Sequence, residues 1–180
     1  MRQDSRFQKT HFIFCDSHGL QLLFGDVLDI QPLKDIMARI QAVAAYFRNA
    51  PLQLARLRDH QAELYKGKTY GFALAVVTRW GTQYAVVRSL LRSEAALNAF
   101  ARDPKATVKD SEERLRLKNI KAELRDLTFW RDVKFLEDIL KPIHKQQVKS
   151  ESLAHHLGGV FRGWNCCKWG PFSLLYKHAS

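Results

Sequence analysis

The sequence predicts a mainly helical α/β chain with two or three strands, and three observations favour that fold class. Apolar residues recur every three or four positions over most of the chain, which is the period of a helix with one buried face. Two short runs, residues 11–15 and 72–78, are continuously apolar and β-rich, as buried strands are. The chain has 180 residues, enough for one domain with a real core.

The first half contains three expected helices. Apolar spacing predicts the first over residues 20–29, after the strand at 11–15. Pro32 opens the second helix, and Asn49 ends it. Its apolar stripe is continuous and consists of Leu33, Ile36, Met37, Ile40, Val43, Ala44 and Phe47. Pro51 begins a third helix with a weaker face, made of Leu54, Leu57 and Leu64.

Capping residues predict the helices that follow the strand at 72–78. Thr82 is the expected cap of one helix and Ser93 the cap of a short continuation. Residues 103–107 read as a loop and as the main internal boundary. Asp110, with Glu113 three residues later, is an acidic capping box that starts a charged helix.

Helical spacing then continues towards the C-terminus. The inward positions are expected to be Leu117, Ile120, Leu124, Leu127, Phe129, Val133, Leu136, Leu140 and Ile143. Pro142 is expected to bend or end this element. Ser150 is the expected cap of a last amphipathic segment that reaches Trp164. Residues 165–180 lack any pattern, and we expect this tail to be poorly ordered and dispensable.

The charge of the chain suggests a polyanionic partner. The formal net charge is +11, and the positive excess is densest in residues 141–180, with six Lys/Arg against one Asp/Glu. An excess of this kind supports weak, sequence-independent attraction to nucleic acid. The same charge also suits a merely soluble surface.

Composition also predicts the compartment. No apolar run is long enough to cross a bilayer, so no membrane association is expected, and the N-terminal residues lack the apolar segment of a secretory signal. Three cysteines, two of them adjacent at Cys166 and Cys167, make a poor disulfide framework. We therefore expect an intracellular, non-secreted protein.

Cys15 and His18 have the spacing of half a zinc site. A second pair of ligands is needed, and none stands at a suitable spacing, so a packed cysteine beside a hydrogen-bonding histidine is the better account. No phosphate-binding glycine loop is present, and Asp16 is the one carboxylate at the end of an expected strand. The sequence therefore predicts no metal site and no catalytic residue.

The segment Thr78-Arg79-Trp80-Gly81-Thr82 stands where the second expected strand gives way to a helix. An indole at such an edge can stack on a nucleic-acid base, and the neighbouring guanidinium can pair with phosphate. Arg79 and Trp80 are therefore the predicted DNA-binding residues. On residue chemistry alone, surface charge beside a core tryptophan is the commoner meaning of such a tripeptide.

Four motifs, taken together, resemble hAT-superfamily transposases in order and spacing across residues 10–164. They are Cys15-Asp16-Ser17-His18-Gly19-Leu20, with Asp26 and the helix that ends at Tyr46-Phe47-Arg48-Asn49; Thr78-Arg79-Trp80-Gly81-Thr82 with Leu90-Leu91-Arg92; Phe129-Trp130; and Ile139-Leu140-Lys141-Pro142. This resemblance favours a DNA role for Arg79 and Trp80.

The resemblance implies a fragment of a ribonuclease H-like catalytic domain that runs into an all-helical insertion. Residues 1–102 would form the partial core, 103–164 would begin the insertion, and 165–180 would be the unpatterned tail. Cys15 and His18 would be a structural motif, and the tryptophan would stack on distorted DNA.

The family uses Mg²⁺ or Mn²⁺, but its catalytic carboxylates have no counterparts here. The expected function is thus a catalytically incomplete, transposase-derived DNA-binding domain without cofactor, located in the nucleus by family resemblance. The alternative is a domesticated protein-interaction module that binds its partner through the helices of 111–164.

Overall fold

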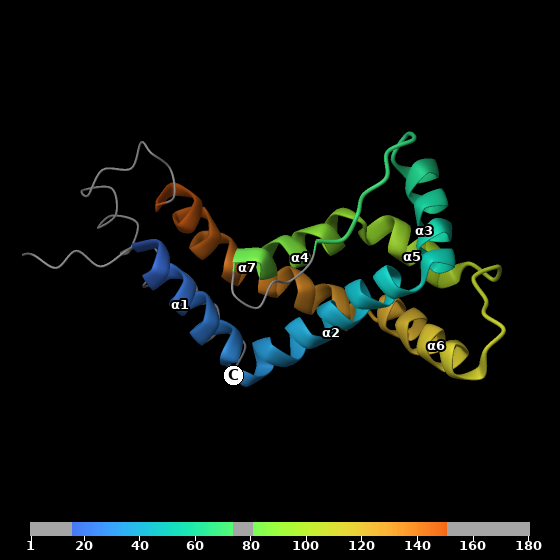
Figure 1. The fold of residues 1–180 in the computed structure, drawn as a ribbon, viewed down its shortest axis with the longest axis horizontal. Coiled ribbons are helices and arrows are strands. Elements are labelled where there is room, and N and C mark those ends of the chain that lie inside the picture. The colour runs from blue at the N-terminus through green and yellow to red at the C-terminus, as the bar shows by residue number, and fades with distance from the viewer. Residues whose placement is uncertain (1–15, 74–80, 151–180) are drawn as a thin grey trace, which may run out of the picture.

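The computed structural model describes residues 16–73 and 81–150, and these residues form seven helices (Figure 1). In chain order they are α1 (Asp16–Asp29), α2 (Gln31–Asn49), α3 (Pro51–Leu64), α4 (Gly81–Arg92), α5 (Glu94–Arg102), α6 (Ser111–Arg125) and α7 (Leu127–Ser150).

The expected α/β class is wrong, because the two described ranges contain helices and no strand. Phe72 and Ala73, at the start of the expected second strand, lie in irregular structure. Residues 74–78 and the whole of the expected strand 11–15 lie outside the described residues. Without a sheet, the ribonuclease H-like core that the resemblance implied is not present in the described part of the chain.

Side chains replace strand partners at residues 70–73. Gln61, fully buried on α3, accepts the Tyr70 N–H at 2.9 Å and donates its amide to the Tyr70 carbonyl at 3.1 Å. The Ala73 N–H donates to Ser89 Oγ on α4 at 3.2 Å. Because buried backbone groups must find partners, these bonds let the segment pack on helices without a neighbouring strand. The β propensity of this segment therefore does not decide its structure, because contacts with α3 and α4 do.

Several helix ends lie where the sequence predicts them. Pro32 is in the first turn of α2, Asn49 ends that helix, and Pro51 is the first residue of α3. The Asp110 carboxylate accepts the Glu113 N–H at 2.9 Å and caps α6. These residues act locally, through a fixed φ angle or a side-chain cap, and are therefore readable without the tertiary structure.

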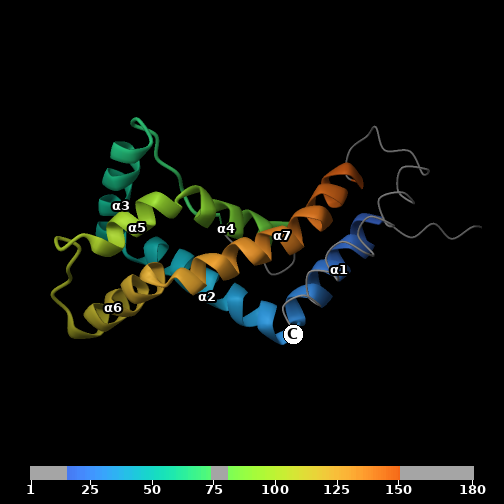
Figure 2. The ribbon, with the colours of Figure 1, turned by 180° about the vertical axis from the view of Figure 1, so that it is seen from behind.

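Other expected ends are wrong in detail. Helix α4 begins at Gly81, so Thr82 lies inside it and does not cap it. Ser93 precedes α5 as expected, but its hydroxyl makes no capping bond and accepts the Gln61 amide at 3.0 Å. Pro142, which was expected to bend or end its element, lies inside α7 and leaves the helix unbroken. In Figure 2 the last turns of α7 rise more steeply than its first turns, as expected at a proline that removes a helical hydrogen bond.

Helix α7 is the central element of the fold. It packs against α1, α2, α4 and α6, while α5 joins α3 to α6 at the other end of the molecule. Figures 1 and 2 both show α1 beside the C-terminal part of α7, far from α3, α5 and α6. The loop after Arg102 connects α5 to α6, and helices on both sides of it contribute to one hydrophobic core.

The core confirms most of the predicted apolar stripes. Phe47 is fully buried, and its ring lies 5.0 Å from that of Phe100 and 5.6 Å from that of Phe72. Two predicted inward residues are wrong: Leu64 is 48% exposed and Leu127 is 84% exposed. Both stand at a helix terminus, where fewer neighbouring elements are available to cover a side chain.

Arg39 connects α2 to α6 and α7 through ion pairs. From α2 its guanidinium contacts Glu123 at 2.6 Å, Asp132 at 3.0 Å and Asp126 at 3.4 Å, carboxylates of α6, of α7 and of the residue between them. It also lies over the Phe129 ring, 5.3 Å from its centroid.

Two cationic side chains of α6 donate hydrogen bonds to backbone carbonyls at and just after the end of α5. Lys121 Nζ donates to the carbonyls of Asp103 at 2.7 Å and Ala106 at 2.9 Å, and Arg125 donates to the Ala101 carbonyl. The last carbonyls of a helix have no partners within it. Cations near them also interact favourably with the negative end of the helix dipole. Lys121 and Arg125 therefore fix α6 against the α5 terminus.

Candidate nucleic-acid interface

The predicted site residues are only partly described. Cys15, Arg79 and Trp80 lie outside the described residues, so their predicted roles stay predictions. His18 lies exposed in the first turns of α1. Within residues 16–73 and 81–150, no group of three or more His, Cys, Asp or Glu side chains is arranged to hold a metal ion.

Helix α4 starts tightly against α7. A Cβ atom placed on Gly81 would lie 2.8 Å from Gln147 Oε1, closer than real Cβ contacts allow. A larger residue here would require the end of the Gln147 side chain to move, so the contact shows how closely α4 begins against α7. Its consequence is that the chain following Arg79 and Trp80 enters α4 beside the C-terminal turns of α7.

The outer side of α7 carries a row of cations. Arg131, Lys134, Lys141, Lys145 and Lys149 follow one another at intervals of three, four or seven residues, which places them on one side of the helix. We call these five residues the cationic face. It extends over roughly 27 Å at a rise of 1.5 Å per residue. Asp138 is the one carboxylate in the same row.

Several cations of this face contact carboxylates in the described ranges. Lys134 pairs with Glu94 of α5 at 2.9 Å. Glu137 is shared, because Arg88 of α4 contacts it at 2.8 Å and Lys141 lies 4.0 Å away. The Asp132 carboxylate, 3.5 Å from Arg131, also contacts Arg39.

The positive excess increases towards the end of α7. Residues 139–150 contain three lysines and no Asp or Glu, and α4 contains Arg88 and Arg92 and no acid. Together these two packed segments carry five cations without a carboxylate of their own. Such a surface attracts anions in solution and is suited to phosphate groups.

Tyr84 and His144 join α4 to α7 beneath this surface. Their ring centroids are 4.4 Å apart. Burial and the nearby Glu137 carboxylate raise the pKa of Tyr84, so its hydroxyl stays protonated at neutral pH and donates to Glu137 at 3.4 Å. The ring contact and this hydrogen bond join α4 to α7 beside Arg88, which also donates to Glu137.

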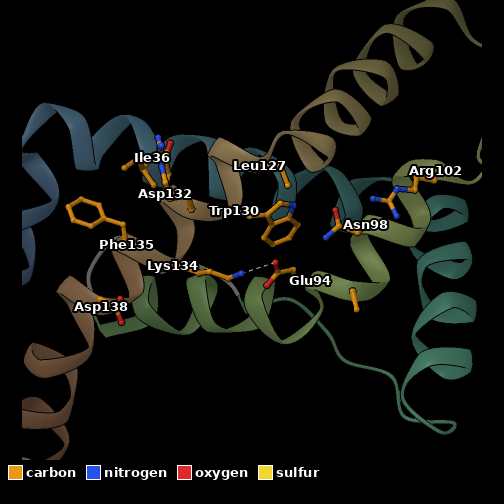
Figure 3. Close-up of a pocket in the computed structure, with 12 residues that line it drawn as sticks. Ile36, Glu94, Asn98, Arg102, Leu127, Trp130, Asp132, Lys134, Phe135 and Asp138 are labelled. Atoms are coloured by element: carbon orange, nitrogen blue, oxygen red, sulfur yellow. Dashed lines mark hydrogen bonds and ion pairs between the residues drawn. The ribbon is translucent and has the colours of Figure 1, made fainter. Parts of the chain in front are cut away.

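A hollow of about 1180 Å³ lies at the N-terminal part of the cationic face, between α5 and α7 (Figure 3). Figure 3 shows Lys134 reaching across it to Glu94, with Asn98 and Arg102 on α5 further along. Leu127 and Phe135 supply apolar lining. The lining also holds three carboxylates, Glu94, Asp132 and Asp138, which balance its three cations, so the hollow adds no positive excess to the cationic face.

The sequence predicted positive charge near the C-terminus but did not single out these residues. The signal that could have found them is the spacing of Lys141, Lys145 and Lys149, each four residues from the next. Four-residue spacing places side chains on one side of a helix. Glu94 and Arg88 could not be found this way, because they approach α7 only through the tertiary fold.

The alternative function, a protein-interaction module, would bind its partner through the apolar residues of α6 and α7. Most of these residues pack inside this chain. Leu117, Leu124, Val133, Leu136, Leu140 and Ile143 are all buried in the core. A protein partner of α6 and α7 would have to contact other side chains. No helix in the described ranges is long and apolar enough to cross a membrane.

Comparison of the chain with protein families, with curated proteins and with solved structures finds no match. The resemblance to hAT transposases therefore depends on the sequence motifs alone.

Proposed function

We propose that this chain binds nucleic acid through the phosphate backbone, with the cationic face of α7 and Arg88 of α4 as the contact surface. The observation that carries the proposal is the combination of an ordered row of cations with the absence of acids from residues 139–150 and from α4. Phosphate contacts need no particular base sequence, so the binding is non-specific.

The spacing of the row suits a phosphate chain. Neighbouring cations of this row are three, four or seven residues apart, or about 4.5–10.5 Å along the helix, and the phosphates of one DNA strand are about 3.4 Å apart along the duplex axis. A face of roughly 27 Å can therefore lie beside several phosphates at once. Non-specific binding of this kind has a Kd of about 10⁻⁴–10⁻⁶ M at physiological salt.

The motif residues Arg79 and Trp80 belong to the same proposal. They directly precede Gly81, the residue that packs beside Gln147 of α7. The hAT resemblance assigns the tryptophan to stacking on distorted DNA, and its position in the chain brings it next to α4, the helix that also carries Arg88. Descent from such a transposase, and with it a nuclear location, is part of this proposal and is supported by the motifs.

Salt dependence tests the cationic face. The triple variant Lys141→Gln, Lys145→Gln, Lys149→Gln removes three cations from it. Binding of a short DNA duplex, measured by fluorescence anisotropy over a series of salt concentrations, should weaken. The slope of log K against log salt should fall by about 2–3, since each phosphate contact contributes about 0.9.

A matched triple variant controls for net charge. Lys105→Gln, Lys109→Gln, Lys118→Gln removes the same charge from exposed positions near α6, at the other end of the molecule (Figure 1). It should leave the slope almost unchanged. Equal losses in the two triple variants would show that total charge, and not this face, determines binding. Salt-insensitive capture of a protein would instead favour the interaction module.

Trp80 requires a separate test. Trp80→Ala should weaken binding to single-stranded or distorted DNA by about 1–3 kcal/mol, the usual contribution of stacking on one base. Binding to intact duplex should change less, because its bases are already stacked on one another. Equal losses on both substrates would mean that Trp80 is a core residue.

A further inference from the structure

A second cleft lies between α2 and α6, away from the cationic face. Its volume is about 360 Å³, within the range of small-molecule sites. Helix α2 contributes Ala42, Ala45, Tyr46 and Asn49, and α6 contributes Glu113, Arg116, Asn119 and Ile120. The alanines leave space on the α2 side, while Val108 and Ile120 are half-buried apolar lining.

Polar groups in this cleft face an unfilled space. The Tyr46 hydroxyl and the Glu113 carboxylate form no hydrogen bond to another side chain or backbone group in the described ranges. They are nonetheless close enough that Glu113, after burial, contributes to raising the pKa of Tyr46 to about 12. Asn49 and Asn119 add one amide from each helix.

The cation that lines this cleft, Arg116, already has an ion-pair partner. Arg116 pairs with Glu112, one turn earlier on α6, and leaves Glu113 without an ion pair among the described residues. A carboxylate beside a tyrosine ring attracts a positive charge in two ways, by ion pairing and through the negative face of the ring. The two amide oxygens can accept further N–H groups.

We infer that the cleft between α2 and α6 binds a small organic cation with several N–H donors, such as an amidinium or guanidinium group on an apolar stem. The charged group lies between Glu113 and Tyr46, and its stem lies over Ala42, Ala45 and Ile120. This binding is independent of the phosphate contacts of the cationic face, because it uses a carboxylate and different helices.

Benzamidine is the probe, and benzamide, which has nearly the same shape without the charge, is the matched control. In ¹⁵N–¹H spectra of the full chain, benzamidine should cause saturable shifts centred on residues 42–50 and 113–120, with a millimolar Kd. Benzamide should bind at least ten-fold more weakly. Equal binding of the two compounds would overturn the inference.

Two variants locate the charge. Glu113→Gln should weaken benzamidine binding at least ten-fold, whereas Glu63→Gln, with the same loss of charge at an exposed position of α3 outside the cleft, should change it less than two-fold. Tyr46→Phe keeps the ring and should weaken binding a few-fold through loss of the hydroxyl contact. Undiminished binding in Glu113→Gln, or shifts centred elsewhere on the chain, would contradict the site.

Discussion

The two ends of the molecule use cations in opposite ways. Near α5 and α6, Lys121 and Arg125 donate to backbone carbonyls, and nearby Arg39 contacts three carboxylates. Along the outer side of α7, the nearby carboxylates lie at or before Asp138, and the last twelve residues of the helix contain three lysines and no acid. Similar side chains thus stabilise the fold at one end and present charge to solvent at the other.

This difference separates stability from binding. A cation that satisfies buried or partly buried acceptors cannot be removed without leaving those acceptors short of partners. A cation on an exposed helix surface contributes little to stability, because water and salt screen it. Substitutions at the two ends should therefore change different measurements.

Arg39→Met should cause the largest loss of stability, about 2–3 kcal/mol by urea unfolding. Methionine keeps the apolar stem, but Glu123, Asp126 and Asp132 then lose their shared cation. The value lies at the low end for charged networks because the arginine side chain is 34% exposed. Lys34→Met, on the exposed start of the same helix, is the control. A loss no larger than in the control would mean that Arg39 adds no net stability.

Lys121→Met should cost less, about 1–2 kcal/mol, because two carbonyl oxygens lose a charged donor. The same substitution at Lys118, exposed on the same helix, should change stability by less than about 0.5 kcal/mol. Similar losses at the two positions would refute a specific role for Lys121 at the end of α5.

Acid should weaken the junction between α6 and α7. Hydrogen bonds from the hydroxyl and N–H of Thr128 lower the pKa of Asp126 below its ordinary value of 3.8. Because the folded pKa is lower than the unfolded one, the carboxylate stabilises the fold above about pH 4, and this contribution is lost as pH falls through the folded pKa. The difference in urea midpoint between the unmodified chain and Asp126→Asn should therefore shrink from pH 7 to pH 3. A constant difference would rule out this linkage.

The smallest expected effect on stability is that of Lys145→Gln. This residue is exposed on α7, and the substitution should change the free energy of unfolding by less than about 0.5 kcal/mol. In the same variant, the salt dependence of DNA binding should become shallower by about one unit of slope if Lys145 contacts a phosphate. A large change in stability would place Lys145 with the structural cations.

Local signals predicted much of the helical content. Pro32, Pro51 and Asp110 act through their own backbone or the next turn, and their helices begin where the sequence indicates. The expected strand is wrong at Phe72 and Ala73, because the local sequence says nothing of Gln61 and Ser89, which bind the backbone at 70–73 from two different helices.

Tertiary pairing explains the rest of what the sequence missed. Arg39 meets its three carboxylates across more than eighty residues of chain, and no spacing rule connects them. Leu127 was placed inward by continuing one helical period, but the chain breaks at Asp126 and starts a new helix. The α7 lysines could have been found from their four-residue spacing. The cleft between α2 and α6 could not, because its two sides are far apart in the sequence and meet only in the folded chain.

The central position of α7 has a consequence for synthesis on the ribosome. Helix α1 packs mainly on α7, yet 97 residues separate the end of one at Asp29 from the start of the other at Leu127. At about 5–20 residues per second, the apolar side of α1 waits roughly 5–20 s for its partner to be made. A nascent chain halted before residue 127 should therefore expose Leu20, Phe24 and Val27, and should be held by chaperones or cut by proteases more readily than the chain that includes α7.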